Sequence, residues 1–148
     1  MAKISRELQI KAPVRKVFEM VYDPNKLPEI WPNLIEIKNV KESNLGGYDY
    51  SWAYNMLGLR LEGKTQVIEF LTNRRLVTKS TKGIEDTVTW NFKGDGEESH
   101  LTFEMDYQIP ASLLSRHPEQ LILENNGHEV DAMLKNLKTT AELELVHA

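Results

Sequence analysis

The feature that most constrains the fold is the stretch from Pro118 to about Val146. Its apolar residues recur at helical spacing along one face, at Leu123, Val130, Leu134, Leu137, Ala141 and Leu145. The opposite face is polar, with Glu124, His128, Asp131, Lys135, Lys138 and Glu142. A long helix with one apolar stripe cannot bury that stripe alone, so the rest of the chain must supply a large apolar surface.

The middle of the chain predicts that surface, because its apolar and polar residues alternate. The alternation is clearest in residues 47–57, where Tyr48, Tyr50, Trp52, Tyr54 and Met56 share one side. Similar patterns predict six consecutive strands at residues 34–43, 47–57, 59–71, 76–81, 86–93 and 100–109. Short turns between them indicate an antiparallel meander with one wet face. We expect a bulge near Val40 and a bulge or bend at Gly63.

The segment before the meander predicts one more strand and two short helices. Residues 3–11 alternate as a strand, and Pro13 opens a short helix that runs to about Tyr22. Residues 26–31 suit a short irregular helix or turn. The first strand must therefore join the sheet at an edge or cross over, and residues 111–117 link the sheet to the long helix. The predicted class is α+β, with seven strands in a curved antiparallel sheet wrapped around the C-terminal helix.

Length and charge exclude several classes of protein. The 148 residues fit one domain spanning 1–148, and the absence of cysteine excludes a disulfide framework. A net charge of −4 with scattered signs gives no basic surface for nucleic acid. No stretch approaches the roughly 20 apolar residues of a membrane span. We expect a soluble, cytoplasmic protein that does not insert into membranes, and a homodimer remains open.

The aromatic residues on the inner strand faces fit either a cavity or an ordinary core. Wide aromatic rings with polar tips fill these faces, whereas a dry core is usually built from Leu, Ile and Val. Asn126 and Gly127 stand on the helical stripe, where a leucine would be expected, and Gly127 would leave room beneath the helix. Alternatively, residues 125–127 break the helix into two pieces.

The sequence offers little acid, base or metal chemistry. The four histidines have no metal-site spacing, and His128-Glu129 lacks the second histidine of a zinc-protease helix, so neither metal nor cofactor is predicted. Glu104 and Asp106 alternate with apolar residues and should face water. The polar groups expected inside are phenol, indole, amide and hydroxyl, including Thr78 and Ser80. No buried cation or carboxylate is evident, which favours binding over catalysis.

Three stretches resemble a known family. Residues 12–18 (Ala-Pro-Val-Arg-Lys-Val-Phe), residues 23–32 ending in Trp31-Pro32, and residues 52–56 (Trp-Ala-Tyr-Asn-Met) are similar to the polyketide cyclase/dehydrase and coenzyme Q-binding subfamily of the START-like, or helix-grip, superfamily. The resemblance covers essentially the whole chain. It implies a helix-grip fold with a cavity between the concave sheet and the long helix. Members bind lipids, quinones, hormones or polyketides, and only some are enzymes.

Carried over by position, the resemblance places Trp31 at the cavity mouth. It implies fifteen ligand-binding residues, namely Trp31, Tyr50, Trp52, Tyr54, Met56, Leu59, Leu61, Trp90, Phe103, Met105, Tyr107, Asn126, Val130, Met133 and Leu134. We expect about half of them to touch the open volume. No catalytic residue is assigned, and Tyr54, Tyr107 and Asn126 are the candidates for acid and orienting groups.

Three functions follow, in order of preference. The first is a domain that binds or carries a small lipophilic molecule such as a quinone, lipid or polyketide-like compound. The second is a cyclase/dehydratase with a cavity tyrosine as proton donor and Asn126 orienting the substrate. The third is a non-enzymatic interaction module that docks a partner or a second copy.

Overall fold

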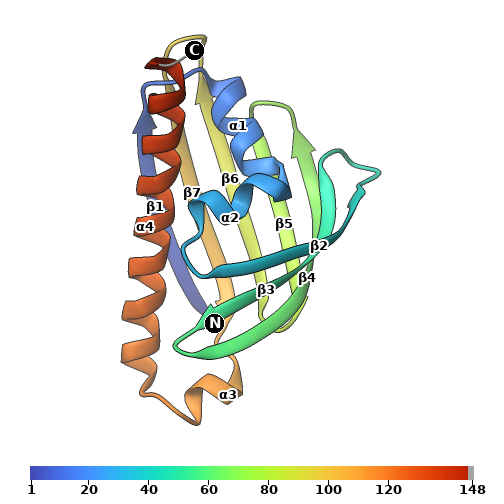
Figure 1. Ribbon diagram of the computed structural model, residues 1–148, viewed down its shortest axis with the longest axis vertical. Coiled ribbons are helices and arrows are strands. Elements are labelled where there is room, and N and C mark those ends of the chain that lie inside the picture. The colour runs from blue at the N-terminus through green and yellow to red at the C-terminus, as the bar shows by residue number, and fades with distance from the viewer. Residues whose placement is uncertain (147–148) are drawn as a thin grey trace.

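The computed structural model describes the backbone of residues 1–146 and the side chains of residues 1–143 (Figure 1). The strands are β1 (Ala2–Ile10), β2 (Leu34–Glu42), β3 (Tyr48–Met56), β4 (Leu59–Leu71), β5 (Arg75–Lys82), β6 (Glu85–Gly94) and β7 (Ser99–Gln108). The helices are α1 (Val14–Tyr22), η1 (Pro24–Lys26), α2 (Leu27–Ile30), α3 (Ala111–Leu114) and α4 (Glu119–Val146). The predicted fold class is thus confirmed, except that residues 111–117, expected to be a simple linker, contain α3.

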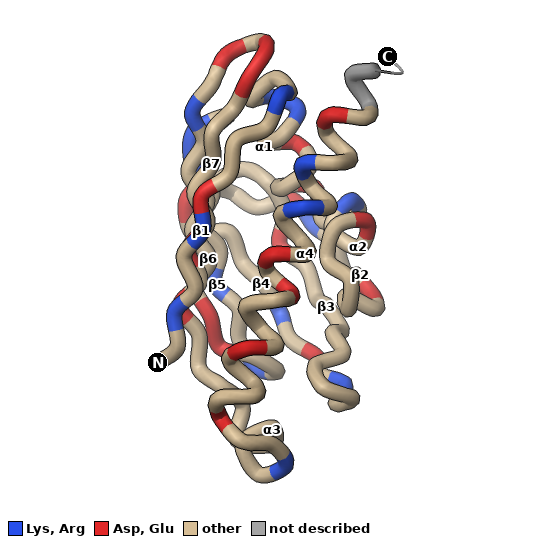
Figure 2. The backbone as a smooth tube through the Cα atoms, turned by 90° about the vertical axis from the view of Figure 1, so that its left-hand side faces the viewer, with Lys and Arg blue, Asp and Glu red and all other residues tan. Residues whose placement is uncertain are grey.

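The strands form one antiparallel sheet in the order β1-β7-β6-β5-β4-β3-β2. Strand β1 joins the far end of the meander by pairing with β7, from Ala2 opposite Tyr107 to Ile10 opposite Ser99. The sheet curves so strongly that β2 and β3 run steeply across the direction of β1 and β7 in Figure 1. Figure 2 shows α4 along the open side of this curved sheet, from α3 at one end to the neighbourhood of α1 at the other. Sheet and helix therefore enclose an interior between them.

Two predicted irregularities in the sheet have different outcomes. The pairing of β2 with β3 shifts register between Lys38 and Lys41, and Asn39 has a φ of 56°, so the bulge expected near Val40 is confirmed. Gly63 forms no bulge, because its pairing with Trp52 is in continuous register. A Cβ on Gly63 would lie only 2.4 Å from Cζ2 of Trp52. The ring of Trp52 instead packs against the backbone of β4 at Gly63.

Helix α4 buries a stripe that is rotated from the predicted one near its start. Ile122 is fully buried, whereas Leu123, which we expected on the inner face, is 39% exposed. Both residues are apolar and they differ by about 100° around the helix, so spacing alone did not decide between them. Further along, Val130, Leu134, Leu137 and Ala141 are buried as predicted. The expected burial of Leu145 falls outside the described side chains.

The expectations for residues 125–127 are also corrected. Helix α4 is continuous through them, so the alternative of a break is wrong. Gly127 does not line the open volume beneath the helix, and an added Cβ would make an ordinary contact 3.5 Å from a guanidinium nitrogen of Arg6. Arg6 reaches this region from β1 and donates a hydrogen bond to Asp131, with a 2.7 Å separation between Nε and Oδ1. Only Asn126 of this group faces the interior, where it is 6% exposed.

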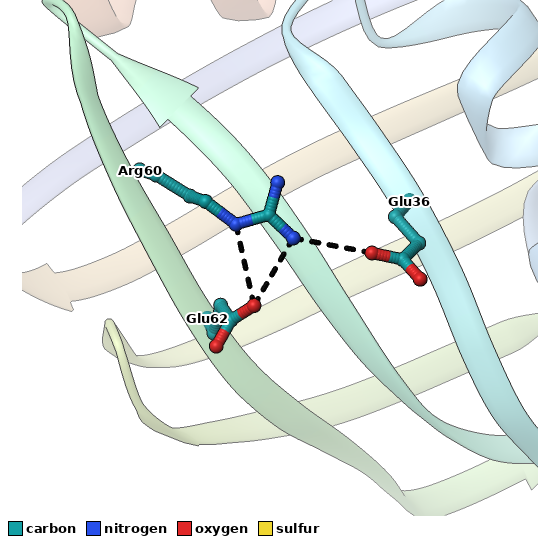
Figure 3. A network of polar contacts seen from close by, with 3 residues as sticks. All are labelled: Glu36, Arg60 and Glu62. Atoms are coloured by element: carbon teal, nitrogen blue, oxygen red, sulfur yellow. Dashed lines mark hydrogen bonds and ion pairs between the residues drawn. The ribbon is translucent and has the colours of Figure 1, made fainter.

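The outer face of the sheet carries charged networks, as the alternation predicted for Arg60, Glu62 and Lys64. Figure 3 shows Arg60 of β4 reaching across β3 to Glu36 of β2 while it also contacts Glu62 on its own strand. These side chains are about half exposed, so solvent screens the ion pairs strongly. Among the described residues, no helix is long and apolar enough to cross a membrane.

Candidate ligand-binding cavity

A cavity of about 150 Å³ lies between the concave face of the sheet and α4. Strands β3 to β7 line it from one side, and α2 and α4 from the other. All three tryptophans of the protein, Trp31, Trp52 and Trp90, are among its lining residues. Its lining includes no Lys, Arg or His within the described chain. The interior is therefore an aromatic chamber without a positive charge.

Most of the residues expected at the ligand site line this cavity. They are Trp31, Tyr50, Trp52, Tyr54, Met56, Trp90, Phe103, Met105, Tyr107, Asn126 and Val130. Phe103 lies at the centre of the aromatic wall, with its ring centroid 4.8 Å from Trp90 and 6.5 Å from Trp31. Such edge-on and tilted contacts fix the ring orientations. That these residues bind a ligand remains a prediction.

Four of the expected residues lie outside the cavity lining. Leu59 and Leu61 belong to the β3–β4 end of the sheet, where Leu61 is buried and Leu59 packs against the core. Met133 and Leu134 follow Val130 on α4 and belong to the packed core. Helices α1 and α2 also contact α4. The cavity is therefore shorter along α4 than the resemblance implied.

The expectation of an interior without carboxylates is wrong. Asp86 of β6 and Glu129 of α4 both line the cavity, and Glu129 is only 8% exposed. The sequence held a signal for Asp86, because it precedes Val88 and Trp90 at the strand period of two. Glu129 directly precedes the buried Val130 on α4. Residue type gives no such signal, because carboxylates in proteins are mostly exposed.

Asp86 ends a line of hydrogen bonds that crosses four strands. Trp52 of β3 donates from Nε1 to Oγ1 of Thr65 on β4, at 3.0 Å. That oxygen lies 2.7 Å from the hydroxyl of Ser80 on β5. Ser80 stands opposite Asp86 in the sheet, and it hydrogen-bonds the carboxylate through its hydroxyl and its backbone. Thr78 and Ser80 line the cavity, as expected for interior hydroxyl groups.

Burial controls the ionisation of this line of groups. It raises the pKa of Asp86 to about 6, although the hydrogen bonds from Ser80 act in the opposite direction. Burial also raises the pKa of Tyr50 far above its ordinary value, and the nearby Asp86 charge adds to that effect. Oδ1 of Asp86 is buried and accepts no hydrogen bond within the described part of the chain. The line therefore ends on a carboxylate oxygen that has no protein donor.

A second polar cluster surrounds Glu129. The Tyr54 hydroxyl donates to Oε2 of Glu129, and Asn33 donates to the same oxygen at 3.1 Å. Asn125 donates to the other oxygen, Oε1. Burial raises the pKa of Tyr54, and the charge of Glu129 raises it further. This cluster satisfies the Glu129 carboxylate and holds Tyr54 as a hydrogen-bond donor.

Tyr107 and Asn126 form a third contact beneath α4. The Tyr107 hydroxyl donates to Oδ1 of Asn126 at 2.7 Å, and Asn126 turns its amide nitrogen toward the Met56 sulfur at 3.4 Å. Burial, with a smaller contribution from Glu129, raises the pKa of Tyr107 to about 12. The phenols of Tyr54 and Tyr107 are therefore protonated at neutral pH. They can orient a polar group, but they release a proton with difficulty.

The sequence matches the family described as "Polyketide cyclase / dehydrase and lipid transport" over residues 1–142. A comparison with curated proteins found no significant match. Solved structures with the same fold include a START superfamily protein from Mycobacterium smegmatis, with a TM-score of 0.79, 14% identity and coverage of 95% of this chain and 97% of the other.

Two further structures are those of an aromatase/cyclase and of a di-domain ARO/CYC protein. Zhui from Streptomyces sp. R1128 gives a TM-score of 0.78 at 13% identity, over 97% of this chain and 95% of its own. The di-domain StfQ of the steffimycin pathway gives 0.77 at 16% identity, over 97% of this chain and 51% of its own. At these identities the likeness shows the fold alone, and the family assignment rests on the sequence match. The chain therefore belongs to the polyketide cyclase/dehydrase and lipid transport family.

Proposed function

We propose that the protein binds a small lipophilic molecule in the cavity between the sheet and α4. The observation that carries the proposal is the composition of the lining, in which aromatic and aliphatic side chains surround a few convergent polar groups. Such an arrangement is typical of sites for small organic ligands. The aromatic rings supply contact area, while the clusters at Asp86 and Glu129 supply hydrogen-bonding groups that orient the ligand.

The cavity volume limits what this conformation accepts. Ligand sites usually enclose roughly 300–1,000 Å³, whereas this cavity encloses about 150 Å³. A dry engineered cavity of about that size in another protein accepts benzene. One aromatic ring therefore fits without rearrangement, and a lipid or a multi-ring polyketide requires side chains to move.

Tryptophan fluorescence provides a direct test. Because all three tryptophans line the cavity, a ligand that enters it should change the emission saturably and raise the melting temperature by mass action. The panel would include single-ring aromatics, quinones, fatty acids and polyketide-like phenols.

Val88→Phe supplies the control, because Val88 is half-buried and lines the cavity, so that a larger side chain fills open volume. We expect this variant to fold and to bind the same compounds more weakly. The proposal fails if no compound changes the emission or the melting temperature of the wild-type protein, or if Val88→Phe binds them equally well.

A cyclase or dehydratase activity is the second candidate, and the contact between Tyr54 and Glu129 favours it. The contact holds a protonated phenol inside the cavity, which is the form that a general acid requires, and general acid catalysis contributes roughly 10²–10⁴-fold. If the protein turns over a bound substrate, Tyr54→Phe should lower kcat by about that factor while binding persists. Unchanged turnover in both Tyr54→Phe and Tyr107→Phe would exclude these phenols as the acid.

A further inference from the structure

We propose that Asp86 selects ligands by their polar head. The cavity should take lipophilic molecules that present a hydrogen-bond donor, a hydroxyl or an amine, to Oδ1 of Asp86. It should disfavour molecules whose polar atoms are acceptors only, such as quinones and ketones. This inference rests on the proposed function and narrows the class of ligand.

The hydrogen-bond donors nearest to Asp86 in this line of contacts have partners of their own. Trp52 donates its only side-chain N–H to Thr65. The hydroxyls of Thr65 and Ser80 lie 2.7 Å apart, so one of the two donates to the other, and Ser80 also interacts with the Asp86 carboxylate. Tyr50 hydrogen-bonds Thr65. Each of these donors is therefore already engaged within the line of hydrogen bonds.

Tyr107, on the other side of Asp86, does not donate to it either. Tyr107 of β7 stands opposite Asp86 in the sheet, but its hydroxyl donates to Asn126 on α4. Oδ1 of Asp86 is buried without a donor in the described chain. Buried carboxylate oxygens are almost always hydrogen-bonded, since leaving one unpaired is costly. Because Asp86 lines the proposed ligand cavity, a bound ligand can supply the hydrogen-bond donor for Oδ1.

The charges around the cavity also favour a ligand that donates a hydrogen bond. Its lining holds no Lys, Arg or His among the described residues, so the protein offers Asp86 no counter-ion there. The other ionisable groups that face the interior are the phenols of Tyr50, Tyr54 and Tyr107 and the carboxylate of Glu129. Glu85, the neighbour of Asp86 on β6, is exposed. A ligand that donates a hydrogen bond stabilises the ionised Asp86. A ligand that offers only an acceptor oxygen is repelled by the Asp86 carboxylate.

This selection predicts opposite pH dependences for the two kinds of ligand. Above about pH 6 Asp86 is mostly ionised and accepts from a hydroxyl or an ammonium group. Below that pH it is mostly protonated and can itself donate to a carbonyl or ether oxygen. Donor ligands should therefore bind best above the pKa of Asp86, and acceptor ligands below it.

The test compares three probes that share one aromatic ring: phenol, benzylamine and anisole. Binding would be measured by tryptophan fluorescence and calorimetry at pH 8 and pH 5. At pH 8, phenol and benzylamine should bind about tenfold more tightly than anisole, as expected for a hydrogen bond to a charged group. At pH 5 the difference should narrow, because anisole gains affinity. Comparison of phenol with benzylamine shows whether a hydroxyl or a cation is preferred.

Two variants separate this inference from the proposed function. Asp86→Asn keeps the shape but removes the charge, so the preference for phenol over anisole should fall to within about twofold and lose its pH dependence. Glu85→Gln should behave like the wild type. Equal binding of all three probes to the wild-type protein, or a preference that survives in Asp86→Asn, would overturn the head-group selection and leave the proposed function intact. Failure of every probe to bind would overturn the head-group selection, and failure of the wider panel as well would overturn the proposed function.

Discussion

Replacing Gly63 by alanine is expected to lower the free energy of unfolding by about 2 kcal/mol, within the range for inserting a methyl group into a packed interior. The new Cβ would lie 2.4 Å from Cζ2 of Trp52 and 2.7 Å from the backbone oxygen of Thr81. Neither neighbour moves easily, since the indole is hydrogen-bonded to Thr65 and Thr81 belongs to the paired strand β5. At this chain length the melting temperature should fall by about 4–8 °C.

Gly63→Ala should also alter the cavity, because the displaced indole is part of its wall. Tryptophan emission and ligand affinity would report that change along with thermal unfolding. Gly96→Ala is the matched control, since a Cβ there meets nothing within 4 Å. A variant at Gly63 that is as stable as the Gly96 variant would show that Trp52 can lie elsewhere without cost.

Replacing Asp86 by asparagine is expected to stabilise the protein at pH 8 by about 2 kcal/mol. Burial raises the pKa of Asp86 from 3.8 to about 6, so the folded state holds the proton more tightly than the unfolded chain. The stability contributed by this group is therefore greatest below about pH 4 and is lost as the pH rises to about 6. Two pKa units correspond to nearly 3 kcal/mol, and partial exposure of the residue reduces that figure.

Urea unfolding of wild type and Asp86→Asn at pH 8 and pH 4 would measure this effect. The difference between the two proteins should be largest at pH 8 and should nearly vanish at pH 4, where the wild-type carboxyl is mostly protonated in the folded state. Glu85→Gln, one residue earlier and exposed, should show no such pattern. A pH-independent difference would mean that the asparagine acts through packing or hydrogen bonding rather than through charge.

The strand pattern predicted much of this architecture because side chains in a strand alternate strictly between two faces. Once a strand is assigned correctly, its inward-facing residues are known too, as with Trp52 and Tyr54. The same rule pointed to Asp86, which was missed because a carboxylate was assumed to be exposed. Helix phase was less certain: Ile122 and Leu123 are adjacent and both apolar, and only the packed sheet decides which is buried.

The volume of the cavity and the contents of its polar clusters could not be predicted from the sequence. They depend on contacts between residues far apart in the chain, such as Tyr54 with Glu129 and Trp52 with Thr65. The role of Gly63 is another example, because its neighbour across the sheet, rather than its own backbone, requires a residue without a side chain. Periodicity identifies which face a residue occupies, but it does not specify the partner that it meets there.

The pairing of β1 with β7 has a consequence for how the chain reaches its native state. Ile10 pairs with Ser99, so β1 leaves the ribosome before β7 and can pair with it only after the strands between them have been made. Closing so long a loop is entropically costly, and topologies rich in distant contacts fold slowly. We therefore expect the hairpins between β2 and β7 to assemble first and the N-terminal strand to dock late. Until then the backbone of β7 is an open edge that a neighbouring nascent chain, or a chaperone, can reach.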